Sequence, residues 1–356
     1  MPQMYNVLML GASYGSLLAA KLLLAGHNAK LVCLPAEVEL INAEGAVVKM
    51  PIKGREGLVE LKTIEMPGSM SAAGPADIDP SKFDLAVLAM QEPQYRSPDV
   101  RALLEAIAEA NLPCMSIMNM PPLPYLKRIP GLDTNLCRES YADATVWDKF
   151  DPALMTLCSP DPQAFRPPEE KVNVLQVRLP TNFKSARFES DTHTAILNRL
   201  ESDINAIRYD LGGEQVELPV KLRVHDSIFV PMAKWCMLLA GNYRCVMAEE
   251  MRSIRDAVHT NLDESKAVYN WVSDLCVSLG ADPGDMVPFE KYADAAQSLV
   301  SPSSAARALA AGAPRIERVD RLVKSLAARK GKSLEAINNT VDLVDNWLEK
   351  NREKAL

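Results

Sequence analysis

The chain has 356 residues, more than one ordinary hydrophobic core accommodates, so its length indicates two domains. With 48% hydrophobic and 24% charged residues it has the composition of a soluble globular protein, and a formal net charge of −7 argues against broad attraction to nucleic acid or anionic membranes. No apolar run approaches the ~20 residues that span a bilayer, and the N-terminus lacks the basic region of a signal peptide, so we expect a cytoplasmic protein.

Cysteine and histidine usage indicates neither a metal site nor a disulfide framework. The 7 cysteines are scattered without a C-x-x-C pair, and the chain has only 4 histidines. We therefore expect no bound metal and assign no function to any cysteine.

The first part of the chain alternates strand and helix patterns. A short apolar run over residues 5–10 is followed by small residues, a helical pattern over 17–25 and a second apolar strand over 29–34. The alternation continues with a strand, a helix and a strand, over residues 83–89, 98–110 and 114–118. Repeated strand–helix–strand units predict a parallel sheet with helices on its faces.

Between and after these units the patterns are less regular. Residues 45–65 alternate apolar and polar side chains and predict the edge strands of a hairpin, whereas the Pro-, Gly-, Ser- and Ala-rich residues 66–80 predict a loop. The proline cluster over residues 121–124 excludes a helix there. Further along, the patterns predict a strand, a helix and a last strand, over residues 172–177, 192–207 and 216–224.

The pattern changes beyond about residue 223. Apolar residues recur at three- and four-residue intervals and predict helices separated by Pro or Gly signals, over residues 228–258, 264–279, 288–299, 304–311, 316–328 and 334–351. We therefore predict an α/β domain over residues 1–222 and an all-helical domain over residues 223–356.

The turn after the first strand has the character of a phosphate-binding loop. Small residues at this turn allow the backbone of a dinucleotide fold to approach a pyrophosphate at the positive end of the next helix. The chain has Gly11 and Gly15 here, one residue short of the full G-x-G-x-x-G spacing. We predict cofactor contacts from the whole turn, which comprises Gly11, Ala12, Ser13, Tyr14, Gly15 and Ser16. The alternative is a tight strand–helix turn that binds no phosphate.

The end of the second strand leaves the choice between NAD and NADP open. An acidic residue there would bind the adenosine ribose, whereas Arg or Lys would bind the 2′-phosphate of NADP. Cys33, Leu34 and Pro35 provide neither group, and Glu37 lies beyond the proline.

Together these features resemble the ketopantoate reductase (2-dehydropantoate 2-reductase) family. Residues 11–31 are similar to the family's opening strand–helix–strand unit, and residues 84–91 to the strand and loop beneath the nicotinamide. The family's usual lysine is replaced around Met90 and Gln91, and Asn119 stands where the family has a cofactor-contacting asparagine. The resemblance implies a Rossmann-like nucleotide-binding domain, a helical domain like the C-terminal domain of 6-phosphogluconate dehydrogenase, NADP as cofactor, and a homodimer.

The family reduces a 2-oxo acid to a 2-hydroxy acid with NADPH, and a lysine is the general acid. Aligned on Trp235, the family's lysine position holds Met237 and its asparagine position holds Gly241. The nearest substitutes are Lys234 and Asn242, which lie roughly 80° apart around an α-helix. Methionine cannot donate a proton, so this chemistry requires Lys234 or another acid. The alternative is that Lys234 is an ordinary solvated lysine.

Ser304 and Glu317 complete the site that the resemblance implies. Ser304 keeps the family's Ser-Ser context, and Glu317 stands one residue later than the family's glutamate. The alternative for Glu317 is a polar residue in the first turn of a helix, where the helix dipole favours it. Arg315 and Arg318 flank Glu317 and could bind a substrate carboxylate.

Three functions are compatible with this sequence. The leading hypothesis is an NAD(P)-dependent oxidoreductase that transfers hydride to or from a 2-oxo or 2-hydroxy acid, or a related carbonyl, in a cleft between the domains. Lys234 would exchange the proton, Asn242 and Ser304 would orient the substrate, and Glu317 would bind a hydroxyl or amine. The alternatives are an opine-type dehydrogenase that reduces an imine, and a non-catalytic nucleotide-binding or scaffold descendant of the family.

Overall fold

The computed structural model describes residues 3–355, which divide into two units. The first, called here the sheet unit, comprises the residues up to Met90 together with Gln94–Tyr125 and Val146–Asp226. The second, the helical unit, comprises the residues from Ser227 onward together with Gln91–Pro93 and Leu126–Thr145. Two short segments from the first half of the chain therefore belong to the helical unit.

An eight-stranded sheet forms the centre of the sheet unit, in the order β14-β11-β8-β7-β6-β1-β2-β5. All neighbours pair in parallel except β8 and β11, which are antiparallel. The strands are β1 (Asn6–Leu10), β2 (Asn28–Val32), β5 (Met70–Ala73), β6 (Leu85–Leu88), β7 (Cys114–Ile117), β8 (Met155–Ser159), β11 (Phe183–Ala186) and β14 (Leu222–His225). This arrangement confirms the predicted Rossmann-like, mainly parallel sheet.

The strands at the centre of this sheet are covered on both faces. Val7, Leu8, Met9 and Leu10 of β1 are fully buried, as expected for a parallel sheet with helices on both sides. The covering helices are α1 (Tyr14–Leu24), α2 (Pro35–Glu44), α3 (Pro98–Glu109) and α5 (Asp191–Ala206). Continuous apolar runs in the sequence therefore become strands whose side chains pack on both faces.

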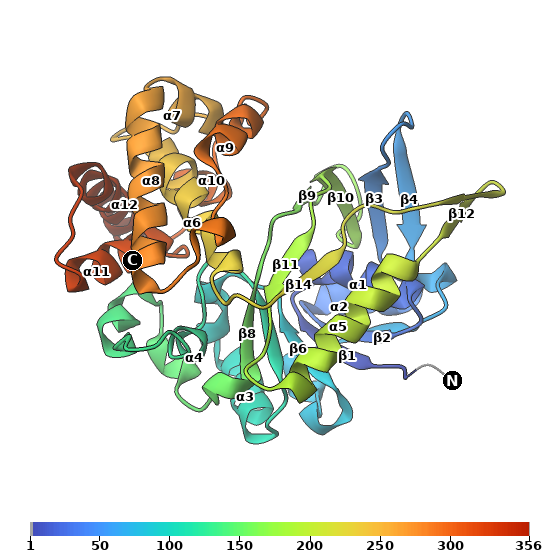
Figure 1. The fold of residues 1–356 in the computed structure, drawn as a ribbon. Helices are drawn as coiled ribbons and strands as arrows, with labels where there is room; N and C mark the ends of the chain where they lie inside the picture. Colours follow the sequence, from blue (N-terminus) through green and yellow to red (C-terminus); the bar gives the residue numbers. More distant parts are fainter. Residues whose placement is uncertain (1–2, 356) are drawn as a thin grey trace. The chain divides into compact units, whose positions relative to one another are not determined.

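A second sheet and a separate ribbon complete the sheet unit. The predicted hairpin over residues 45–65 is confirmed as β3 (Val47–Pro51) paired antiparallel with β4 (Leu58–Lys62). It belongs to a four-stranded sheet in the order β4-β3-β10-β9, with β9 at Gln163–Phe165 and β10 at Val174–Leu179. Strands β12 (Tyr209–Leu211) and β13 (Glu214–Val216) form a ribbon that projects from the rest of the unit (Figure 1).

Three predictions of local structure in the sheet unit were wrong. The expected last strand over residues 216–224 is not continuous, because β13 ends at Val216, β14 starts at Leu222, and Val220 between them has a φ of +62°. The expected loop over residues 66–80 contains β5, which pairs with β2 because Ala72 can pack into the core despite the surrounding small and polar residues. The proline cluster does not exclude a helix, because α4 (Leu123–Leu126) starts beyond the first two prolines. Its one internal proline, Pro124, lies in the first turn, where proline is tolerated.

In the helical unit, the expected continuous helix over residues 228–258 was also wrong. The segment is a short 3₁₀ turn, α6 (Lys234–Met237), a π-helical turn η9 (Leu238–Asn242) and a second 3₁₀ turn η10 (Tyr243–Cys245). An extended stretch follows, and α7 (Ile254–His259) begins where the Ser253 side chain accepts a hydrogen bond from Asp256 N.

The remaining helices of the unit match the predicted positions to within a few residues. They are α8 (Leu262–Leu279), α9 (Phe289–Ala296), α10 (Ser304–Ala310), α11 (Val319–Arg329) and α12 (Glu335–Lys354). Within the described residues 3–355, none of the helices has the length and apolar character needed to cross a membrane.

Candidate functional site

The loop after β1 lies at the switch point of the parallel sheet. From β1 the chain moves to β2 and β5 on one side, then returns to β6, β7 and β8 on the other. In open parallel sheets, ligands bind at the carboxyl ends of the strands where the order reverses. Gly11 follows β1, Met90 follows β6 and Asn119 follows β7, so three predicted cofactor residues lie at the same edge of the sheet.

Gly11 is held where the backbones after β1 and β6 approach each other closely. Its φ is +110°, a conformation that residues with a side chain rarely adopt. A Cβ on Gly11 would lie 2.8 Å from both Ala89 O and Met90 Cγ. Gly15 differs, because a Cβ there would lie 3.6 Å from Met9 Cβ, an ordinary contact. Glycine is therefore required at position 11 and merely compatible at position 15.

The first turn of α1 contains nothing that would compete with an anion. The Ser13 side chain makes no capping hydrogen bond, and no acidic residue occupies the turn. Ser16 Oγ donates instead to Ala12 O at 2.6 Å and so turns away from the helix end. A helix N-terminus that lacks its own cap presents backbone N–H groups to a negatively charged ligand. These residues fit the pyrophosphate of a dinucleotide.

The other predicted cofactor residues differ in exposure. Met90 and Asn119 are half-buried in the sheet unit, and Met90 N donates to Tyr95 Oη at 3.0 Å. Gln91 is exposed and belongs to the helical unit.

The end of β2 carries an ion pair that the sequence did not indicate. Glu37 is buried near the start of α2, where its Oε2 accepts from Leu34 N at 3.0 Å, and its other oxygen contacts Arg166. Arg166 comes from the segment just after β9, more than a hundred residues away along the chain. The strand end therefore has both a carboxylate and a guanidinium, although Cys33, Leu34 and Pro35 supply neither.

Lys234 and Asn242 occupy opposite ends of the distorted helix in the helical unit. Lys234 is half-buried at the start of α6, and Asn242 is half-buried at the end of the π-helical turn η9. A π turn closes i→i+5 hydrogen bonds, so each residue advances by less than the 100° of an α-helix. Asn242 is thereby rotated toward the face of Lys234 relative to the expected 80°. Among the described residues, none hydrogen-bonds to the Asn242 side chain.

Gly241 is glycine because an aromatic side chain fills the space beside it. A Cβ on Gly241 would overlap Tyr292 Oη, which donates to Met237 O at 3.1 Å. An asparagine at position 241 could not be accommodated without moving Tyr292. Glycine at position 241 therefore matches the close packing of Tyr292.

The two adjacent serines at the start of α10 have different environments. Ser303 is buried, caps α10 by accepting from Ala306 N at 3.1 Å, and donates its hydroxyl to Asn242 O at 2.7 Å. Ser304, the predicted site residue, is exposed in the first turn of the helix. The structure therefore links Ser303, rather than Ser304, to the segment that carries Asn242.

Glu317 lies beside a second carboxylate, Glu92, within the helical unit. Both side chains are buried, and Glu92 N approaches Glu317 Oε1 at 3.4 Å. The Glu92 carboxylate accepts from Ala142 N at 3.1 Å. Burial, and then the negative charge of Glu317, raise the pKa of Glu92 to about 7 despite that hydrogen bond. Glu92 therefore holds its proton to a higher pH than an ordinary glutamate does.

The residues after Glu317 are fixed by buried interactions. The Arg318 guanidinium donates two hydrogen bonds of 2.9 Å to the buried Asp320 and one of 2.5 Å to Asp345. Burial alone would lower the pKa of Arg318, but the two carboxylates outweigh it and raise the pKa. Tyr243 Oη donates to Glu317 O at 2.6 Å and accepts from Val319 N at 3.1 Å.

These contacts decide which groups near Glu317 can meet a substrate. Arg318 is already neutralised, so it cannot supply the carboxylate-binding charge that the sequence suggested, whereas Arg315 is exposed. The backbone on either side of Arg318 is held by Tyr243, which bonds to Glu317 O and Val319 N.

Comparison with known proteins identifies the fold but no near relative. No family model matches the chain, and no curated protein sequence matches it. Solved structures do match. A 2-dehydropantoate 2-reductase from Methylococcus capsulatus superposes with a TM-score of 0.65 at 12% identity, covering 97% of each chain. The chain has the ketopantoate reductase fold.

Two further structures have the same fold over nearly the whole chain. D-mandelate dehydrogenase, solved with NADH and anilino(oxo)acetate, gives a TM-score of 0.63 at 11% identity, covering 98% of this chain and 99% of that one. A dimeric ketopantoate reductase from Staphylococcus aureus gives a TM-score of 0.59 at 7% identity, covering 97% of this chain and 99% of that one. The predicted resemblance to ketopantoate reductases is confirmed for the fold.

Proposed function

We propose that this chain is an NAD(P)-dependent oxidoreductase that acts on a 2-oxo or 2-hydroxy acid, or a related carbonyl compound. The observation that carries the proposal is the geometry after β1. Gly11 allows the backbones to approach at the sheet's switch point, beside a helix N-terminus that its own side chains leave uncapped. The proteins that share the fold are named as ketopantoate reductases and as a dehydrogenase solved with NADH.

In this proposal the sheet unit binds the dinucleotide and the helical unit supplies the groups for the substrate. The bound nicotinamide supplies or accepts the hydride. Lys234 gives or takes the proton at the carbonyl oxygen, because it is the nearest acid to the family's lysine position. Asn242 and Ser304 orient the substrate, and Glu317 binds a hydroxyl or amine.

Glu92 is a residue that we add to this set. General acids work best when their pKa lies near the working pH, and the pKa of Glu92 is raised to about 7 beside Glu317. Glu92 can therefore exchange a proton with a substrate group that is bound beside Glu317.

We propose NADP as the preferred cofactor, on the basis of Arg166. Its guanidinium is held by Glu37 at the end of β2, the strand end that faces the adenosine ribose in dinucleotide folds. Arg166→Ala should weaken NADPH binding about tenfold, a typical effect of one phosphate-binding arginine, and leave NADH binding nearly unchanged. A larger loss for NADH would reverse the assignment.

The test of the main proposal is a cofactor titration followed by a substrate panel. Quenching of intrinsic fluorescence by NADPH and NADH reports binding, and loss of absorbance at the nicotinamide band with a series of 2-oxo acids reports turnover. Lys234→Ala should lower kcat by about 10²-fold or more, as expected when a general acid is removed. Unchanged kcat would show that Lys234 is not the acid. Binding without turnover on any substrate would favour a non-catalytic descendant.

A second candidate is an opine-type dehydrogenase that reduces the imine formed between an amino acid and a 2-oxo acid. The observation that favours it is the buried Glu92–Glu317 pair, since two carboxylates suit an ammonium or iminium better than a lone hydroxyl. NADPH oxidation that requires both a 2-oxo acid and an amino acid would establish this function. Oxidation with the 2-oxo acid alone would exclude it.

We also propose that the protein works as a homodimer, as the S. aureus ketopantoate reductase is described. Light scattering of the purified chain tests this directly, because a dimer has twice the chain mass of 39.1 kDa.

A further inference from the structure

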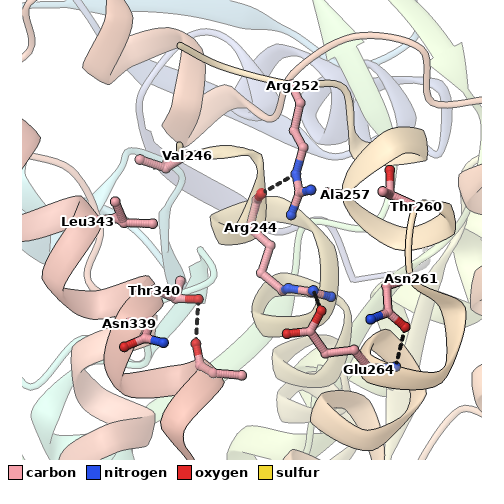
Figure 2. Close-up of a pocket in the computed structure, with 11 residues that line it drawn as sticks. Arg244, Val246, Arg252, Ala257, Thr260, Asn261, Glu264, Asn339, Thr340 and Leu343 are labelled. Carbon is pink, nitrogen blue, oxygen red and sulfur yellow. Dashed lines mark hydrogen bonds and ion pairs between the residues drawn. The ribbon is translucent and has the colours of Figure 1, made fainter. Parts of the chain in front are cut away.

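The helical unit contains a pocket that the proposed chemistry does not use. It has a volume of about 260 Å³ and lies between the segment after η10, the junction of α7 and α8, and α12 (Figure 2). None of its lining residues belongs to the predicted substrate set or to the Glu92–Glu317 pair. The pocket is therefore a candidate for a separate binding site.

Arg244 forms the fixed wall of this pocket. Its side chain is 8% exposed, and it donates from Nη2 to Glu264 Oε2 at 2.6 Å and from Nη1 to Ser265 Oγ at 2.7 Å. Figure 2 shows the guanidinium and the Glu264 carboxylate side by side. Burial, opposed by Glu264 and assisted by the nearby Arg252, lowers the pKa of Arg244.

Arg252 supplies a second guanidinium that is largely unused. Its Nε donates to Arg244 O at 2.9 Å, and its terminal nitrogens point toward Arg244 in Figure 2. Among residues 3–355, no hydrogen bond or ion pair reaches those terminal nitrogens. Arg252 also acts electrostatically on Asp256, which is exposed and already bonded to Ser253 and Arg255.

The lining therefore carries two guanidinium groups and one carboxylate, a net positive charge. Two like charges held close together in a partly buried pocket repel each other, and a bound anion would relieve that repulsion. The terminal nitrogens of one arginine present two parallel donors that match a carboxylate or a phosphate. The net positive charge of the lining therefore favours an anionic ligand, but it does not determine which anion binds.

The remaining walls favour an organic ligand over an inorganic one. Leu343 contributes half-buried apolar surface, Val246 and Ala257 line the pocket at 2% and 1% exposure, and Thr260 and Asn339 are exposed. A phosphate dianion would find only one net positive charge and would leave the apolar wall unfilled. A carboxylate with a short hydrocarbon chain matches both the charge and the apolar surface.

We propose that this pocket binds a small organic carboxylate, with its carboxylate on Arg252 and its hydrocarbon part against Val246, Ala257 and Leu343. None of the residues that line the pocket is assigned to substrate binding or to proton transfer, so the site is independent of turnover. Its existence can therefore be tested on the full chain whether or not the oxidoreductase proposal holds.

Calorimetric titration of the full chain with 3-methylbutanoate, its uncharged amide and inorganic phosphate tests the ligand class. We expect the carboxylate to bind with a Kd on the order of 1 mM, as for a small ligand with one ion pair, and the amide and phosphate to bind at least tenfold more weakly. Equal affinity for the amide would show that charge is not recognised. Tighter binding of phosphate would overturn the assignment to carboxylates.

Variants locate the binding on the protein. Arg252→Met should weaken carboxylate binding at least tenfold. Because Arg252 also contacts the backbone of Arg244, Asn339→Phe provides a second variant that fills the opening from an exposed position on α12 and should abolish binding. The matched control is Asn346→Phe, exposed two turns further along α12 and outside the pocket, which should bind as the parent does. Binding that survives Asn339→Phe would place the carboxylate elsewhere and overturn the proposal.

Discussion

The loop after β1 and the carboxylate pair in the helical unit are built on opposite physical principles. The loop depends on the absence of side chains, because Gly11 leaves no room for a Cβ and Ser13 does not cap the helix. The carboxylate region depends on buried ionisable side chains, since Glu92 lies beside the like charge of Glu317, whereas Arg318 is compensated by Asp320 and Asp345.

The two regions should therefore fail in different ways. In the loop, adding atoms is harmful, because the backbone geometry itself forms the site. In the carboxylate region, removing a compensating partner such as Arg318 is harmful, because it leaves a buried charge unpaired. The first region offers positive potential from the backbone and the second offers negative charge from side chains. Substitutions at Arg318, Glu92, Gly11 and the two serines test this difference.

The largest effect is expected at Arg318. Arg318→Met leaves Asp320, which is fully buried, without its main partner and should lower the free energy of unfolding by about 4 kcal/mol. Urea unfolding measures this. The double variant Arg318→Met with Asp320→Asn removes the stranded charge and should recover part of the loss. A double variant no more stable than the single one would show that the charge is not what destabilises it.

Glu92→Gln should change how stability depends on pH. The pKa of Glu92 rises from 4.5 to about 7 in the folded chain, so the folded state holds an extra proton between these values. The free energy of unfolding therefore falls as the pH rises from about 4.5 through 7. A neutral glutamine at position 92 does not lose stability as the pH rises. The variant should therefore be more stable than the parent by about 2 kcal/mol at pH 8 and about as stable as the parent at pH 4.

Urea unfolding at pH 4 and pH 8 gives the two values for Glu92→Gln. Glu39→Gln, at an exposed position on α2, is the matched control and should leave the pH profile unchanged. Identical profiles for the parent and Glu92→Gln would mean that Glu92 is ionised in the folded protein, and its proposed role beside Glu317 would then be lost.

Gly11→Ala should destabilise the loop by about 2 kcal/mol, because the new Cβ meets the backbone at Ala89 and φ is positive. It should also weaken NADPH binding about 100-fold or more. Gly15→Ala is the paired control, because residue 15 lies inside α1 and its new Cβ would make only ordinary contacts, with Met9 and Ala89. This variant should be as stable as the parent or more stable by about 0.5 kcal/mol. Thermal unfolding and NADPH titration of both variants measure the difference.

The smallest effects separate the adjacent serines. Ser303→Ala removes the cap of α10 and the bond to Asn242 O, so it should lower the free energy of unfolding by about 1 kcal/mol. Ser304→Ala, at an exposed position, should change stability by less than about 0.5 kcal/mol. If Ser304 orients the substrate, only its variant raises KM without loss of stability. A KM change confined to Ser303→Ala would move that role to Ser303.

The fold could be predicted from the sequence because its signals are local. Each signal lies within a short segment of the sequence. Examples are the apolar run of β1 with the small residues and the helical spacing that follow it, and the periodic patterns of α8 and α12. Strand β5 was missed, because its four residues, Met-Ser-Ala-Ala, include no β-branched or aromatic side chain and lie in a stretch rich in Pro, Gly, Ser and Ala.

The carboxylate pair could not be predicted, because its members meet through tertiary structure. Glu92 and Glu317 are 225 residues apart, and nothing in the sequence around either one indicates the other. Arg166 and Glu37 meet at the end of β2 for the same reason. A weak signal did exist for Glu92, which directly follows the Met90-Gln91 segment that the resemblance marked as lacking its lysine.

The turn at Leu238–Asn242 has a consequence for how this chain is aligned with other proteins. A helix that closes i→i+5 accommodates one residue more than a regular turn, which is what a single-residue insertion produces. Counting from Trp235 without a gap places glycine at the expected asparagine position, whereas a one-residue gap within the turn brings Asn242 there. Deleting one residue from this stretch would rotate all that follows by about 100° and separate Tyr243 from the backbone of Glu317.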